Sequence, residues 1–210
     1  MSWDILVSFV PIVAQGLWVT IGLSLGGILG ATVIAISLGT IYEHRSLIVR
    51  RPVRAYVEVM RNLPILVKVF FLYFAVGLDA LPAALSALIL HQSGFMTEIV
   101  ASGIRAVPRE QGEAAYSCGF TAVETQRYVI LPQAIRHTIP PLTSQYVEVI
   151  KNSSVVMLIG VHDLTFATQQ IQYETFRYTE GFIVVTTLYV LIALSVIGAM
   201  NLLQGKLKAR

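Results

Sequence analysis

The sequence contains apolar runs too long for a water-soluble core to bury. The longest lies at about residues 12–41, and four shorter runs follow it. Only 13% of the 210 residues are charged, whereas a soluble domain carries roughly 25%. Since a helix that spans a bilayer needs about 20 mostly apolar residues, the sequence predicts an all-α integral membrane protein.

We expect about five transmembrane helices in a single domain covering residues 1–210. The predicted spans lie at about residues 12–41, 52–77, 81–104, 139–160 and 181–203, and polar residues 91–94 interrupt the third. Gly22, Gly26 and Gly30 recur at every fourth position of the first span. Removing side chains from one stripe lets a neighbouring backbone approach, so this spacing predicts close helix packing.

The basic residues gather on one side of the predicted spans. Eleven of the fifteen lie in the connections after spans one and three or in the C-terminal tail: Arg45, Arg50, Arg51, Arg54, Arg105, Arg109, Arg127, Arg136, Lys206, Lys208 and Arg210. The opposite side has Arg177. Because cytoplasmic loops carry the excess of lysine and arginine, we expect the N-terminus outside and the C-terminus in the cytoplasm. No basic cluster is interleaved with aromatic residues, so a nucleic acid partner is not expected.

Residues 105–138 are too polar to span a membrane but carry strong helix signals. Pro108 suits the start of a helix, and Gly119 supplies a stop. Thr121 and Glu124 form a capping-box pattern, which predicts a second short helix that ends near Leu131, before Pro132. The sequence therefore predicts two cytoplasmic helices joined by a glycine corner, a surface suited to docking another protein.

This segment resembles the EAA motif of ABC importer permeases. The family pattern is Glu-Ala-Ala, three residues, Gly, nine residues, Ile, one residue and Leu-Pro. The matching residues, with Val in place of Ile, are Glu113, Ala114, Ala115, Gly119, Val129, Leu131 and Pro132. Segments 56–64, 97–99 and 151–155 resemble further patterns of the permeases for polar amino acids, with Asn62 and Leu63 departing from the usual Gly-Thr.

The resemblance implies a permease subunit in the bacterial cytoplasmic membrane. In that family the cytoplasmic loop is a coupling helix that sits in a cleft of an ATPase subunit. The implied partners are two ABC ATPases, a second permease that is identical or paralogous, and an extracytoplasmic binding protein that delivers the amino acid. The chain has no phosphate-binding loop, since Gly205-Lys206 is followed by Leu207 and lacks the earlier glycine. ATP and Mg²⁺ would therefore belong to the partner ATPases, with no cofactor in this chain.

Ionisable residues inside the predicted spans mark either a substrate pathway or paired structural groups. Glu58 and Arg61, like Glu148 and Lys151, are three residues apart and can pair on one helix face. A zwitterionic amino acid needs both donors and acceptors, and either reading stays open for each pair. The candidate pathway residues are Arg61, Pro64, Lys68, Glu98, Lys151, Asn152, Ser153 and Ser154.

Three other function classes are weaker readings of the same sequence. An ion-coupled secondary transporter of small polar solutes is the main alternative, although no internal repeat of the kind such transporters use is visible. A membrane-embedded enzyme would need a nucleophile with a base or a metal cluster, and we expect neither. A channel would need a filter-like segment, and none stands out.

Overall fold

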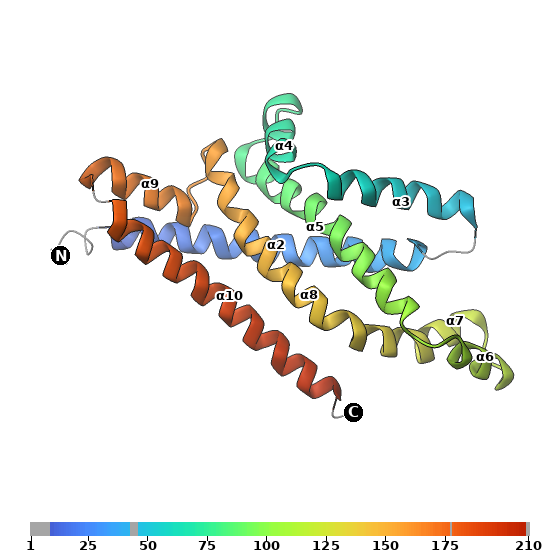
Figure 1. Cartoon of the computed structure of the whole chain (residues 1–210). Helices are drawn as coiled ribbons and strands as arrows, with labels where there is room; N and C mark the ends of the chain where they lie inside the picture. Colours follow the sequence, from blue (N-terminus) through green and yellow to red (C-terminus); the bar gives the residue numbers. More distant parts are fainter. Residues whose placement is uncertain (1–8, 43–45, 177, 209–210) are drawn as a thin grey trace.

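The computed structural model describes residues 9–42, 46–176 and 178–208, and every regular element in these ranges is helical (Figure 1). The α-helices are α2 (Val10–Tyr42), α3 (Leu47–Asn62), α4 (Ile65–Phe70), α5 (Ala80–Arg105), α6 (Arg109–Ser117), α7 (Ala122–Glu124), α8 (Leu131–Ser153), α9 (Leu164–Thr175) and α10 (Tyr178–Lys208). Phe71–Ala75 and Thr125–Ile130 are π-helical, and Ser154–Ile159 is a 3₁₀ helix.

Three of the predicted spans correspond to helices long and apolar enough to cross a membrane. They are α2, α5 and α10. The predicted interruption of the third span is wrong, because α5 runs unbroken through residues 91–94. Gly94 lies where α3 packs closely against α5, and this contact leaves no room for a side chain. A Cβ at that position would lie 2.9 Å from the Cβ of Met60.

The second predicted span is broken rather than continuous. α3 ends at Asn62, Leu63 and Pro64 have extended backbone, and α4 begins at Ile65. Proline disfavours helical geometry in the residue before it, which explains why Leu63 leaves the helix. The fourth predicted span begins earlier than expected, because α8 starts at Leu131.

The core is a close contact between small residues of α2 and α5. Ala31 and Ala35 on α2 and Ala83, Ala84 and Ala87 on α5 have no exposed surface. Without a hydrophobic drive between helices in lipid, such packing of small side chains is what holds the two together. α3, α4 and α8 pack against α5, and α9 packs against α2.

The small-residue stripe of α2 differs from the one the glycine spacing predicted. The buried positions are Gly16, Thr20, Leu23, Ser24, Gly27, Ala31, Ala35 and Gly39. Gly22 is exposed, with nothing within 4 Å of a Cβ built there, while Gly26 and Gly30 face the side-chain ends of Leu85 and Ile89. The predicted close packing is confirmed at Gly26 and Gly30, where a Cβ would lie 2.9 Å and 2.6 Å from these α5 side chains, and it is wrong at Gly22. Alanine, serine and threonine of α2 share the packing role with these glycines.

A buried polar junction ties α2, α9 and α10 together at the end opposite α6 and α7. The Asp163 carboxylate caps α9 by accepting from the Phe166 backbone N–H (2.9 Å) and also accepts from the Tyr189 hydroxyl (3.0 Å). The Leu164 N–H donates to Thr20 on α2 (3.1 Å). Burial raises the pKa of the Asp163 carboxyl, and these hydrogen bonds oppose that shift. The sequence analysis predicted no helix between residues 160 and 181, where α9 lies. Asp163, the N-cap of α9, is the residue from which this helix start could have been predicted.

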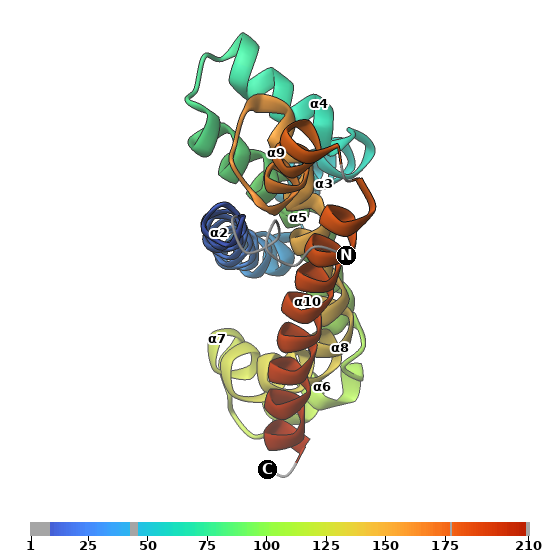
Figure 2. The same cartoon turned by 90° about the vertical axis from the view of Figure 1, so that its left-hand side faces the viewer.

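The connections that carry the basic residues lie at one end of the molecule. The C-terminal ends of α2 and α10, the start of α3 and the pair α6–α7 share this end, while the start of α2 and α9 lie at the other (Figures 1 and 2). Arg45, Arg177 and Arg210 lie outside the described residues. The other basic connections share one end of the molecule, and the assignment of that end to the cytoplasm stays a prediction.

We predict that Gly16→Ala destabilises the fold and that Gly22→Ala does not. A Cβ at Gly16 would lie 2.7 Å from the Asp163 carbonyl oxygen and 3.0 Å from the Leu164 nitrogen, so the backbone of the turn must move. Overpacking of this kind costs about 1–3 kcal/mol. Thermal unfolding of the detergent-solubilised chain measures the effect. Equal melting temperatures for the two variants would contradict the close approach.

Candidate functional site

Residues 109–130 form a helical elbow, and its first arm is α6. Pro108 is its N-cap, as the sequence predicted, and its C-terminus is closed by a Schellman motif. In that motif the Gly119 N–H donates to the Tyr116 carbonyl (2.9 Å) and the Phe120 N–H to the Ala115 carbonyl (3.1 Å). Gly119 has φ +87°, a left-handed conformation that glycine adopts at no steric cost. The predicted glycine corner is confirmed.

The second arm begins at the capping box that the sequence predicted. The Glu124 N–H donates to the Thr121 hydroxyl oxygen (3.3 Å), and the Glu124 carboxylate accepts from the Thr121 N–H (2.8 Å). These two bonds satisfy donors that a helix start leaves unpaired. The backbone N–H and the hydroxyl of Thr121 lower the pKa of the Glu124 carboxyl, because both stabilise its charged form.

The second arm does not end before Pro132 as predicted. α7, the π-helical segment Thr125–Ile130 and α8 follow one another without a break, and Pro132 lies in the first turn of α8. The missing N–H of a proline is harmless where a helix starts, and the π-helical turn places a new start just before it. One helical rod therefore runs from the tip of the elbow into α8.

The outer surface of the elbow combines carboxylates, small residues and uncovered apolar side chains. Glu113 and Ala114 are exposed, whereas Ala115 is buried against the rest of the elbow. Large apolar side chains are also uncovered: Tyr116, Phe120, Val123 and Tyr128 are between 40% and 75% exposed. Clustered exposed aromatic residues of this kind mark protein-binding surfaces. Val129 and Leu131 are half-buried at the base of the elbow, and Pro132 is exposed.

Lys68 holds the break between α3 and α4. Its ammonium group donates to the carbonyls of Met60 (2.8 Å) and Leu63 (2.6 Å) and lies 3.0 Å from Nδ1 of His91. A lysine ammonium has three N–H donors, and these three acceptors engage all of them. The side chain is only 6% exposed, so Lys68 closes the gap that Pro64 opens in the backbone.

Arg61 pairs across two helices rather than along its own. Its guanidinium forms an ion pair with Glu98 on α5 and lies over the Phe95 ring, 5.4 Å from the ring centroid. Glu58, the partner that sequence spacing offered, is exposed on α3. The Arg61–Glu98 pair is itself about 40% exposed, so both charges remain accessible.

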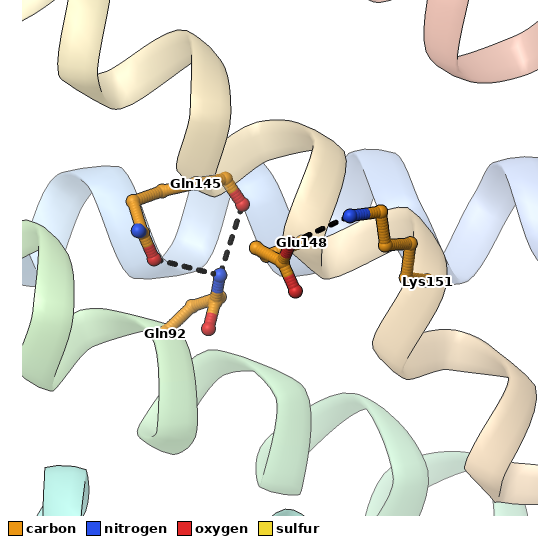
Figure 3. Close-up of polar contacts among 4 residues, drawn as sticks. All are labelled: Gln92, Gln145, Glu148 and Lys151. Atoms are coloured by element: carbon orange, nitrogen blue, oxygen red, sulfur yellow. Dashed lines mark hydrogen bonds and ion pairs between the residues drawn. The ribbon is translucent and has the colours of Figure 1, made fainter.

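A polar pocket of about 500 Å³ lies between α8 and α10. Lys151 donates to the Glu148 carboxylate across 2.7 Å on one wall, and Thr143, Ser144, Asn201 and Gln204 also line it. Beside it, Gln92 of α5 donates to the backbone carbonyl (2.9 Å) and side-chain oxygen (3.2 Å) of Gln145 (Figure 3). The pocket thus offers a cation, an anion and neutral hydrogen-bonding groups.

The other candidates near Lys151 shape the end of α8. The hydroxyl of Ser153 is buried and donates to the Ile150 carbonyl, and that of Ser154 donates to the Lys151 carbonyl, both at 2.7 Å. Asn152 is half-buried. The sequence missed the four neutral polar residues of the pocket, because polar residues on a mostly apolar helix gave no signal until a second helix faced them.

We predict that Thr121→Ala loosens the second arm while Thr121→Ser preserves it. Loss of the cap should raise amide hydrogen exchange across residues 122–130 about two- to tenfold, and mass spectrometry of deuterated peptides measures it. The pH dependence has a definite sign. The ionised Glu124 carboxylate stabilises the second arm fully at pH values above the ordinary carboxyl pKa. This stabilisation is lost as the pH falls through the lowered pKa that Glu124 has in the folded state. Unchanged exchange in the alanine variant would contradict the capping box.

Comparisons with known proteins agree on one class. Residues 31–209 match the family described as binding-protein-dependent transport system inner membrane component. The chain is 30% identical to the glutamine transport system permease protein of Escherichia coli over 99% of this chain and 98% of that protein. It is 33% identical to the L-cystine transport system permease protein of Bacillus subtilis over 81% of this chain and 76% of that one. A crystal structure of an amino acid ABC transporter with histidines superposes with a TM-score of 0.89 at 29% identity, covering 98% of this chain and 99% of that chain.

Proposed function

Because this chain belongs to the family of binding-protein-dependent transport system inner membrane components, we propose that it carries polar amino acids through the cytoplasmic membrane as the permease subunit of an ATP-driven ABC importer. The observation that carries the proposal is the elbow: an ordered, exposed helical pair at the end of the molecule where the basic connections gather. The relatives that transport glutamine and cystine support an amino acid as the solute.

In this proposal the elbow is the site where an ATPase subunit docks. Glu113, Ala114 and Ala115 lie on α6, Gly119 forms the corner, and Val129, Leu131 and Pro132 connect the second arm to α8. The exposed aromatic side chains beside them would become buried against the ATPase, and their burial would favour the complex. ATP and Mg²⁺ would be held by the ATPase, and this chain would have no catalytic activity of its own.

Two copies of the permease domain would face each other, each with an ATPase below it. The second copy would be identical to this chain or a paralogue of it. An extracytoplasmic binding protein would deliver the amino acid to the end that carries α9. When the ATPases close, the continuous helix formed by the second arm and α8 would pass the movement to the wall of the polar pocket, with Pro140 and Pro141 inside α8 as the place where it can bend.

The polar pocket between α8 and α10 suits a zwitterion. Glu148 can accept from the α-ammonium group and Lys151 can donate to the α-carboxylate. The Arg61–Glu98 pair provides a second accessible cation and anion. Lys68 and Pro64 would support the pathway wall rather than touch solute, since the donors of Lys68 are engaged, and Asn152, Ser153 and Ser154 would shape its outer end.

We predict that Glu113→Lys abolishes ATP-driven uptake and reduces co-purification of the ATPase at least tenfold. A lysine would place a positive charge at the centre of the proposed interface, and a like or unpaired charge there costs several kcal/mol. Glu174→Lys makes the same charge change on an exposed site of α9, at the opposite end, and should retain the ATPase. Full retention of the ATPase by Glu113→Lys would rule out this docking surface.

A second prediction concerns the pocket. Lys151→Ala should reduce uptake of the amino acid about tenfold or more, because a charge-assisted contact to the carboxylate is lost, while Lys151→Arg should keep most of it. ATPase co-purification with both variants should stay normal. If Lys151→Ala transports at the full rate, the pocket is not part of the pathway, even though the docking proposal would stand.

A further inference from the structure

A second, apolar groove opens on the other side of α8, between α2, α8 and α10. It has a volume of about 460 Å³. α10 diverges from α2 toward its C-terminus (Figures 1 and 2), and the side chains of Ile36, Ile135, Leu142, Leu203 and Leu207 are among those that line the space. Neither the elbow nor the polar pocket uses this groove, apart from Leu131 at its rim.

The threonine hydroxyls that line the groove need no hydrogen bond from a bound molecule. The hydroxyls of Thr32, Thr40 and Thr138 line it, and each donates within the protein: Thr32 to the Tyr146 hydroxyl (3.2 Å), Thr40 to the Ser37 carbonyl and Thr138 to the Ile135 carbonyl (both 2.9 Å). Since the three threonine hydroxyls donate within the protein and, apart from Tyr146, the other lining residues are apolar, the matching occupant is a hydrocarbon.

The dimensions of the groove fit lipid chains. At 1.5 Å per residue the lining residues extend roughly 12 Å along α2 and roughly 22 Å along α8, which brackets the roughly 15 Å of one bilayer leaflet. A hydrocarbon chain about 4 Å across displaces roughly 200 Å³ over that length, so the groove has room for one chain or both chains of one phospholipid.

The mouth of the groove lies at the end where basic residues gather. Lys206 on α10 and Arg136 on α8 are exposed, and each is the sequence neighbour of a lining residue, Leu207 and Ile135. A phosphate group at the membrane surface would meet these cations. Positive side chains near the surface favour anionic headgroups over neutral ones.

We propose that the groove between α2, α8 and α10 binds an anionic phospholipid of the cytoplasmic leaflet, with its acyl chains against Leu142 and Leu203 and its phosphate near Lys206 and Arg136. The lipid would fill the space between the rod of α8 and its two neighbours. The residues that line the groove include Leu131, where the elbow joins α8. The bound lipid would therefore contact α8, the helix that moves in the proposed function.

The test titrates dioleoyl phosphatidylglycerol into the delipidated full chain in detergent and counts bound lipids by native mass spectrometry. Thr40→Trp fills the mouth of the groove from an exposed position, and Ser37→Trp places the same side chain one turn away, outside the lining. We expect Thr40→Trp to weaken the tightest bound lipid at least tenfold and Ser37→Trp to leave it unchanged. Circular dichroism and gel filtration confirm that both variants are folded.

A second arm tests the headgroup. Lys206→Gln should weaken phosphatidylglycerol about fivefold, the effect of one surface cation, and wild type should bind dioleoyl phosphatidylcholine more weakly than phosphatidylglycerol. Equal lipid binding by Thr40→Trp and Ser37→Trp would overturn the proposal. So would a Thr40→Trp variant that keeps its lipid but loses self-association, because a second copy would then be the occupant.

Discussion

The close contact between α2 and α5 is the interaction on which the rest of the structure depends. In lipid, apolar side chains gain nothing by leaving one hydrocarbon for another, so helices associate where small residues let them approach. Ala31, Ala35, Ala84 and Ala87 have no exposed surface at this contact. α8 joins the same core near the elbow, where a Cβ at Gly103 of α5 would lie 3.0 Å from the Ala134 carbonyl oxygen of α8. The backbones of α5 and α8 therefore approach closely at this point.

In the proposed importer, the elbow acts on this packed core through α8. Its two arms are held in fixed geometry by the Schellman motif at Gly119 and the capping box at Thr121. The second arm continues into α8 through the π-helical segment Thr125–Ile130, and Pro132 lies in the first turn of α8 directly after it. Glu148 and Lys151 lie on that same α8, about twenty residues or roughly 30 Å further along the rod. The elbow and the polar pocket are thus connected by one continuous helix that contains Pro140 and Pro141, which fits an importer whose energy enters from a separate ATPase.

The sequence predicted the helical membrane fold and the local geometry of the elbow, because those features depend on hydropathy and on capping residues a few positions apart. It failed where the outcome depended on contacts between distant segments. The glycine spacing of α2 predicted the close approach of α5 at Gly26 and Gly30 but not at Gly22, and it gave no sign that alanine and threonine would share the contact. The partner of Arg61 came from another helix, and the polar pocket required α10 to face α8. Pro132 was read as a stop because a π-helical turn before it has no simple sequence signal.

The most direct test of the central claim uses Cys118, the only cysteine of the chain, which is exposed at the corner of the elbow. A membrane-impermeant maleimide is applied to right-side-out and inside-out membrane vesicles, each with and without the ATPase subunits bound. The account predicts that Cys118 reacts only in inside-out vesicles and that the bound ATPase protects it. Labelling from the outer face, or labelling that the ATPase does not change, would contradict the proposal that the elbow receives force from an ATPase at the cytoplasmic surface.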